Sequence, residues 1–257
     1  MKKIFAAFLL LLISLPSFAL TIAQQADSAY NADDYSRAIA LYNESIEKEG
    51  RSADVYYNLG NAYYRADKPG MAVVSYERAL RLDPSGDDIR TNLEFVRSHI
   101  ADKPEDDTAF FASLHRSVVC AMSANAWAWT AFAIFVLLMA ATATYIFSTN
   151  VVLRKVSFFG GIVLIFVFLY VLLVASDSKE RATSHDDAVV IVPNTQLTSA
   201  PRASRGADKV VTIHEGTVVE VVDSVATPDD PQSPMWYNVK INNNTKAWLR
   251  SSDVERI

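Results

Sequence analysis

Residues 56–84 constrain the fold of this chain more than any other segment. Small residues at Gly60, Ala72 and Ala79 stand among tyrosines in a pattern that fits two closely packed antiparallel helices. Such a helix pair cannot bury its apolar face alone, so it is built to stack on copies of itself. We therefore expect a helical repeat that presents a groove. A groove of this kind binds rather than catalyses.

Over residues 53–84 the pattern resembles a tetratricopeptide repeat, and the resemblance is weaker on either side. The 34-residue period of that family maps Tyr76 onto Tyr42 and Gly60 onto Ala26, which indicates a degenerate first repeat upstream. The resemblance therefore implies an all-α solenoid.

The second helix of the upstream repeat is expected at residues 35–48, where apolar residues follow the 3.6-residue stripe of a helix. A further helix at residues 87–100 should cap the stack, and residues 20–104 should form this domain. Two repeats and a cap fall below the usual minimum of about three repeats. We therefore expect the stack to need support from a partner or from the segment next to the membrane.

In the tetratricopeptide family, ligands are held by the first helix of each repeat. The resemblance therefore implies a partner-binding groove formed by Asp27, Tyr30, Asn31, Tyr57, Asn61, Tyr64 and Arg65. Asn and Arg side chains can hydrogen-bond an extended peptide or its terminal carboxylate, and tyrosines offer flat contact area. The alternative for Tyr57 and Tyr64 is packing between repeats. A core role is expected for Leu59, Gly60, Tyr63, Ala72, Tyr76 and Ala79.

Residues 20–104 contain fourteen acidic and ten basic residues, a net charge of about −4. Nucleic acid and anionic lipid require clustered Lys or Arg, so this charge disfavours both as ligands of the repeats. The sequence thus favours a protein or peptide ligand.

Two apolar runs, residues 126–147 and 156–175, contain no charged residue. About 20 residues of helix match the thickness of a hydrocarbon core, so the runs predict two transmembrane helices in a hairpin. Trp127 and Trp129 at one end, and Tyr170 in the second run, are amphipathic rings typical of the headgroup level.

The orientation follows from the loop at residues 148–155, whose only charged residues, Arg154 and Lys155, are basic and favour the cytoplasm. Residues 1–19 have the three-part pattern of a secretory signal peptide, with cleavage expected after Ala19; the alternative is a retained N-terminal anchor. Both signals place the two ends of the chain outside. In a bacterial inner membrane, the N-terminal and C-terminal modules would then be periplasmic.

Residues 105–125 are expected to form a linker and an amphipathic helix, which either lies on the outer headgroup layer or packs beneath the repeats. His115 is expected to be exposed at this interface. Cys120 is the only cysteine, so no intramolecular disulfide is possible. It is expected to pack as a small apolar residue, or alternatively to pair between chains.

Residues 176–257 change to short β-branched and aromatic runs, which predict a linker and a small all-β barrel of about five strands. The strands are expected at residues 188–192, 210–213, 217–222, 236–241 and 246–249. Hairpin turns are expected at residues 214–216 and 242–244, and a long loop at residues 227–234.

This part of the chain resembles a bacterial SH3-like domain, through residues 198–201, 214–216, 236–237, 247–248 and Val254. It departs from that family at Ala247, where Gly is usual. The resemblance implies a binding module, and some such domains recognise peptidoglycan peptides. Trp236 and Trp248 could line a ligand cleft, the alternative being a role in the barrel core.

The sequence contains no GxSxG, HExxH, P-loop or CxxC motif, and its four histidines are scattered. We therefore expect no enzymatic activity, no catalytic or metal-binding residues and no cofactor.

The order of these segments resembles the BatE-type proteins of bacterial aerotolerance operons, most specifically at residues 25–30, 34–39 and 212–217. The resemblance implies an inner-membrane assembly with von Willebrand factor A domain proteins, linked to oxidative-stress tolerance and a MoxR-type ATPase. The leading hypothesis is a scaffold that binds periplasmic protein partners through the repeats and the SH3-like module. The alternative is a cell-wall sensor that binds peptidoglycan through the SH3-like domain.

Overall fold

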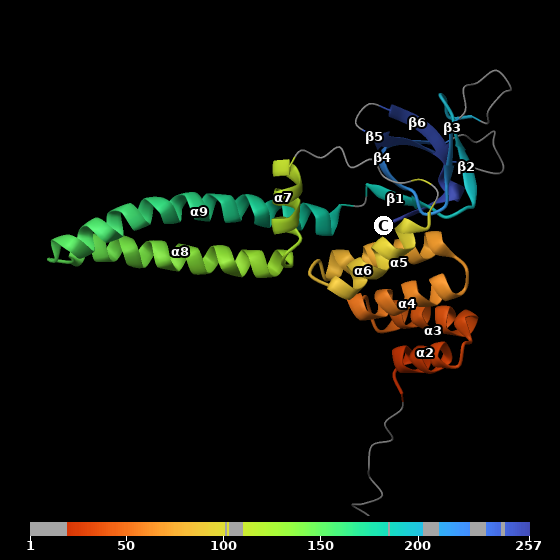
Figure 1. The fold of residues 1–257 in the computed structure, drawn as a ribbon, viewed down its shortest axis with the longest axis horizontal. Coiled ribbons are helices and arrows are strands. Elements are labelled where there is room, and N and C mark those ends of the chain that lie inside the picture. The colour runs from red at the N-terminus through yellow and green to blue at the C-terminus, as the bar shows by residue number, and fades with distance from the viewer. Residues whose placement is uncertain are drawn as a thin grey trace, which may run out of the picture.

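A computed structural model describes residues 20–100, 102, 110–184, 186–202, 211–226, 235–242 and 245–257. These residues form a stack of helices, a long helical hairpin and a group of antiparallel strands (Figure 1). The expected signal peptide, the start of the linker near residue 105 and the expected loop at residues 227–234 lie outside the described residues.

The stack begins with two antiparallel helix pairs, α2 (Ile22–Asn31) with α3 (Tyr35–Lys48) and α4 (Ala53–Arg65) with α5 (Pro69–Leu82). The turns within the two pairs are alike, because Asp33 and Asp67 stand 34 residues apart and both adopt a positive φ, 59° and 58°. Asp tolerates this left-handed conformation better than most residues. The upstream pair is therefore a second copy of the repeat, as the sequence predicted.

The expected core residues of the repeat, Leu59, Gly60, Tyr63, Ala72, Tyr76 and Ala79, are all buried, which confirms that prediction. The glycine allows the close approach of α4 to α5, since a Cβ atom at Gly60 would lie 2.6 Å from the ring of Tyr76. Helix α6 (Asp87–Ser98) packs against α5 at the end of the stack, two residues shorter than expected.

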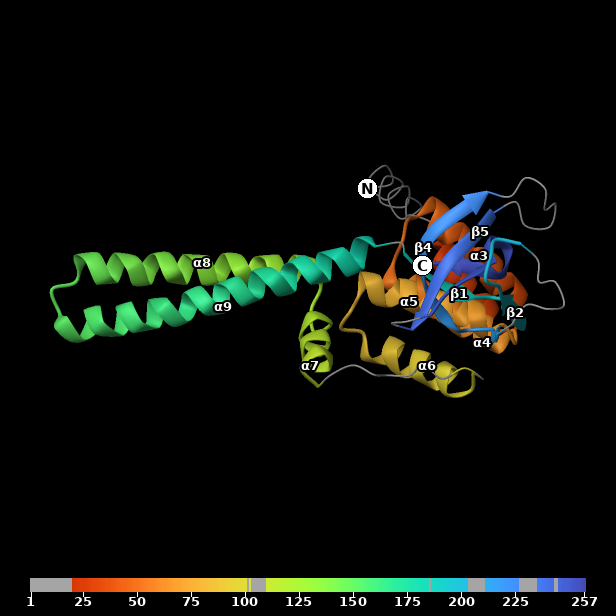
Figure 2. The same cartoon turned by 90° about the horizontal axis from the view of Figure 1, so that it is seen from above.

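Helices α8 (Ala124–Phe147) and α9 (Val151–Thr183) run antiparallel and extend away from the rest of the chain (Figure 2). Both helices are long and apolar enough to cross a membrane. Within the most apolar 18-residue stretch of each helix, only 6% (α8) and 11% (α9) is buried. The loop between them is shorter than the expected 148–155. Asn150 caps α9 by accepting a hydrogen bond from the Val152 backbone N at 2.9 Å, so Arg154 and Lys155 lie in the helix.

Helix α7 (Phe110–Val119) runs across the base of the hairpin and contacts α9 (Figures 1 and 2). His115 is half-buried rather than exposed, because its Nε2 lies 2.8 Å from the Asp177 carboxylate of α9. Cys120 is also only half-buried, and its Sγ accepts a hydrogen bond from Arg181 at 2.9 Å. The expected apolar packing of this thiol is therefore incomplete.

The C-terminal strands form two separate antiparallel sheets, and not the closed barrel that the sequence predicted. A five-stranded sheet has the order β6-β5-β4-β1-β7, and β2 pairs with β3. The strands are β1 (Asp187–Val190), β2 (Asn194–Leu197), β3 (Val211–His214), β4 (Val218–Ala226), β5 (Met235–Asn242), β6 (Thr245–Arg250) and β7 (Val254–Arg256). We call the described residues from 186 to 257 the β module, and α2 to α6 the helical module.

Two of these strands, β2 and β7, were not expected from the sequence. The turn at residues 214–216 is not a hairpin either, because β3 pairs with β2 whereas β4 pairs with β1 and β5. Gly216, with a φ of 88°, lets the chain pass between the two sheets there. Strands β5 and β6 pair as the expected hairpin requires, with Asn242 opposite Thr245, whereas residues 243–244 of the expected turn lie outside the described residues.

The β module docks directly on the last helices of the stack, where β1 and β7 contact α5 (Figure 1). Val189 and Ile257 belong to the same buried apolar cluster as the helical core. The close contact extends to Gly216, where a Cβ atom would lie 2.2 Å from Ile100. The β module thus covers a face of α5 that a further repeat would otherwise bury, a source of support different from the partner or the membrane-proximal segment expected from the sequence.

Asp102 strengthens this docking from the chain that leaves α6. Its carboxylate accepts hydrogen bonds from the His214 backbone N at 2.6 Å and the Thr217 hydroxyl at 2.9 Å, and lies 2.9 Å from the His214 Nδ1. Burial raises the pKa of the Asp102 carboxyl, but the contacts with His214 and Thr217 outweigh burial and hold that pKa below its usual range. The carboxylate is therefore charged at neutral pH.

Candidate functional site

A hydrogen-bonded group on Asp27 joins three helices of the stack, α2, α3 and α4. The Asp27 Oδ1 accepts from the Tyr42 hydroxyl of α3 at 2.6 Å and from the Asn58 side chain of α4 at 3.2 Å. Burial raises the pKa of Tyr42 above its ordinary value and the bond to Asp27 raises it further, so the hydroxyl stays protonated and donates. The group thus fixes the spacing between α2, α3 and α4.

The same group recurs one repeat later with an amide in place of the carboxylate. The Asn61 Oδ1 accepts from the Tyr76 hydroxyl at 2.7 Å and from the Asn92 side chain at 2.9 Å. Each of these three residues stands 34 positions after its counterpart in the first group. Asp27 and Asn61 are therefore equivalent positions that differ in charge, and the pair shows that either side chain satisfies this geometry.

Phe95 in α6 stands 34 positions after Asn61. Its side chain has no polar atom, so it cannot accept the hydrogen bonds that Asp27 and Asn61 accept. Its side chain is 51% exposed. The ring packs edge-on against Tyr64, with 5.7 Å between ring centroids, and lies 4.7 Å from the ring of His99. The series of equivalent positions along the first helices thus runs from a carboxylate to an amide to an exposed phenyl ring.

A hollow of about 340 Å³ lies on the first two of these positions. Its lining residues are Asp27, Tyr30, Asn31, Tyr42, Asn58 and Asn61. Four of the seven predicted groove residues are therefore brought together here. Tyr42 and Asn58 were missed, although their 34-residue match to Tyr76 and Asn92 is visible in the sequence.

The other three predicted groove residues do not line this hollow. Tyr57 and Tyr64 are partly buried and pack against the helical core, which agrees with the alternative of packing between repeats. Arg65 lies 3.5 Å from the Asp33 carboxylate, and its guanidinium stacks 5.0 Å from the centroid of the Tyr35 ring. Its charge is thus already engaged within the protein.

The predicted cleft of the β module is not formed as expected, because Trp236 is only 2% exposed. It belongs to β5, and the Arg250 guanidinium lies 5.7 Å from the centroid of its ring. Trp248 is half-buried in β6 and exchanges backbone hydrogen bonds with Thr198. Of the two tryptophans, only Trp248 could therefore contact a ligand.

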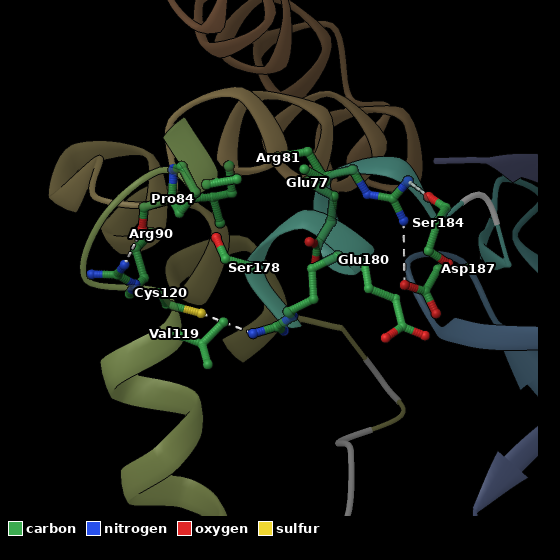
Figure 3. Close-up of a pocket in the computed structure, with 14 residues that line it drawn as sticks. Glu77, Arg81, Pro84, Arg90, Val119, Cys120, Ser178, Glu180, Ser184 and Asp187 are labelled. Carbon is green, nitrogen blue, oxygen red and sulfur yellow. Dashed lines mark hydrogen bonds and ion pairs between the residues drawn. The ribbon is translucent and has the colours of Figure 1, made fainter. Parts of the chain in front are cut away.

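A second hollow, of about 350 Å³, lies where the helical module, α9 and β1 meet (Figure 3). Arg81 of α5 points toward the β module there and donates hydrogen bonds to the backbone oxygens of Ser184 and Ile257 and to the Asp187 carboxylate. Arg181 and Cys120 also line this hollow and are joined there by the hydrogen bond from the guanidinium to the thiol. The polar groups in this hollow mainly join the modules to each other.

The stacked helix pairs, with their repeated hydrogen-bonded groups, define a helical repeat module with a hollow on its first helices. Comparison with family models gives the particular repeat, because residues 53–85 match the tetratricopeptide repeat model. No curated protein matches the chain. The helical module therefore contains a tetratricopeptide repeat, a module that mediates protein–protein interactions.

Proposed function

We propose that this protein is an inner-membrane scaffold that binds protein partners through the groove of its helical module. The observation that carries the proposal is the hollow on Asp27 and Asn61, which has the position of a peptide groove in a tetratricopeptide stack. We assign the chain a binding role and no enzymatic activity.

The placement in a membrane draws support from α8 and α9, whose apolar side chains are mostly exposed over lengths that fit a bilayer. The hairpin brings the chain back to the end from which it left, so the helical module and the β module lie together (Figure 1). With the expected signal peptide, this arrangement favours a periplasmic location for both modules. Membership of a Bat-type aerotolerance complex with von Willebrand factor A domain proteins rests on the sequence resemblance.

The alternative, a cell-wall sensor that binds peptidoglycan through the β module, has less support. Its proposed cleft loses Trp236 to the core, and one face of the module is occupied by α5. We therefore favour the groove of the helical module as the main binding surface.

Blocking the groove tests this function. Asn31 is exposed and lines the hollow, so Asn31→Trp is expected to fill the groove without disturbing the core. Glu47→Trp, at an exposed position of α3 outside the hollow, is the matched control. Proteins that co-purify with the tagged full-length chain from its own cells should be lost with Asn31→Trp and kept with Glu47→Trp. Equal retention by both variants would remove the groove from the proposal.

A further inference from the structure

We infer that the groove recognises an extended protein segment with a basic side chain opposite Asp27 and an apolar side chain against Phe95. This inference rests on the proposed function and specifies the chemistry of the ligand. Its basis is the change of side chain along the three equivalent positions, Asp27, Asn61 and Phe95.

The first step is the charge of Asp27, which no cation in the hollow balances. The residues that line the hollow with it are tyrosines and asparagines, all of them neutral. Both of its hydrogen bonds reach Oδ1, and no described residue donates to Oδ2. A carboxylate that lines a hollow and has one oxygen without a hydrogen bond from the described residues favours a ligand with a Lys or Arg side chain.

The second step argues against the terminal carboxylate that the family resemblance implied as a ligand. Capture of a carboxylate needs a free cation or several free donors. Arg65 is engaged by Asp33 and Tyr35, and the Asn58 side chain already donates to Asp27. A ligand carboxylate would also be repelled by Asp27.

The third step is the apolar platform at Phe95. Its ring is half exposed and is held by edge-to-face packing on Tyr64. Because the ring is already ordered, an apolar side chain of the ligand can bury it without a further loss of rotamer freedom.

The distance between the two sites sets the spacing in the ligand. Direct hydrogen bonds join α2 to α4 and α4 to α6, so these helices are neighbours at about 8–10 Å per step. Asp27 and Phe95 are two steps apart, roughly 16–20 Å, which five or six residues of extended chain span at about 3.3 Å each.

The test uses the equivalence of positions 27 and 61. Asp27→Asn copies the group at Asn61 and should keep the fold, because an amide oxygen accepts the same two bonds there. The double variant Asp27→Asn with Asn61→Asp moves the negative charge one repeat along the groove. The probes are fluorescent twelve-residue peptides in a Ser/Ala background, with Leu at position 9 and Lys or Glu at each of positions 2 to 8. Binding to the purified full-length protein in detergent is followed by anisotropy.

The wild type is expected to bind the peptide with Lys five or six residues from Leu about tenfold more tightly than its Glu counterpart. Asp27→Asn should abolish this preference, and the double variant should prefer Lys about three residues closer to Leu. Phe95→Ser should weaken binding of the Leu peptides but not of the same peptides with Ser at position 9.

Two results would overturn the inference in different ways. Equal binding of Lys and Glu peptides by the wild type, or an unchanged Lys preference in Asp27→Asn, would reject the proposed ligand chemistry and leave the groove as a binding site. If the wild type binds none of the peptides, both the ligand chemistry and a peptide-binding groove would be rejected.

Discussion

Replacing Arg81 with methionine is expected to release the β module from the helical module and to lower the free energy of unfolding by about 2–4 kcal/mol. The Arg81 side chain is 16% exposed and donates to three acceptors beyond α5. The backbone oxygen of Ser184 belongs to the end of the hairpin, the backbone oxygen of Ile257 lies 2.6 Å away, and the Asp187 carboxylate lies at 3.3 Å.

The expected loss exceeds that of an exposed ion pair, which contributes about 0–1 kcal/mol. Methionine keeps much of the side-chain volume but leaves partly buried acceptors without a donor, and such groups cost about 1–3 kcal/mol each. Because Arg81 joins α5, the end of α9 and β1, its loss should loosen all three together.

Hydrogen exchange of the full-length protein checks this prediction. Amides in β1 and β7, and those of α5 on the docked side, should exchange faster in Arg81→Met. The control is Arg97→Met, which removes a partly buried ion pair with Glu77 inside the helical module and should leave β1 and β7 protected. Unchanged exchange of β1 and β7 in Arg81→Met would show that Arg81 is not needed for docking, and that the apolar contacts of Val189 and Ile257 together with the remaining polar contacts hold the modules together.

Gly60→Ala is expected to destabilise the helical module by about 1–3 kcal/mol through overpacking. In an exposed helix the same substitution would raise the stability by about 1 kcal/mol. At Gly60, the close packing should turn this gain in stability into a loss. The added Cβ would lie 2.6 Å from the Tyr76 ring, which is 2% exposed and has little room to move. Displacing that ring would also break its hydrogen bond to Asn61 and thereby damage the groove.

Gly160→Ala is the matched control, since Gly160 lies within α9 and a Cβ atom there meets nothing within 4 Å. Exchange at the amides of α4 and α5 should rise with Gly60→Ala and stay unchanged with Gly160→Ala. Wild-type exchange in Gly60→Ala would mean that the space between α4 and α5 accommodates a methyl group at position 60.

The sequence predicted the helical module well because its signals are local and repeated. The 34-residue period located the degenerate first repeat, and α3 begins and ends where the apolar stripe of residues 35–48 does. The same period relates Tyr42 to Tyr76 and Asn58 to Asn92, so the polar groups of the groove were within reach of sequence reasoning. Tyr42 lies on α3, the second helix of its repeat, where no groove residue was expected, whereas Asn58 lies on the first helix α4 and was missed although its match to Asn92 is visible in the sequence.

The arrangement of the modules could not be predicted in the same way. Arg81 and Asp187 are 106 positions apart, and His115 and Asp177 are 62 positions apart. No local pattern marks such pairs. The apolar run at residues 156–175 likewise indicates which residues can lie in hydrocarbon, but it does not indicate where α9 begins and ends. Asn150 caps the helix well before that run.

The β module shows a further limit of sequence reasoning. A period of two residues identifies a strand but not its partner, so five short runs were assembled into one barrel although β2 and β3 form a sheet of their own. Aromatic residues near strand ends do not reveal whether they face a cleft or a core. Trp236 is buried, whereas Trp248 is only half-buried.

Site-specific photo-crosslinking in living cells tests the central claim, a groove that binds a protein partner, most directly. A photoreactive residue at Asn31 lies in the hollow, and one at Glu47 lies outside it on α3. The account predicts a discrete crosslinked partner from position 31 that is absent from position 47 and is weakened by Asp27→Asn. A partner that crosslinks equally from both positions, or only from position 47, would contradict the account.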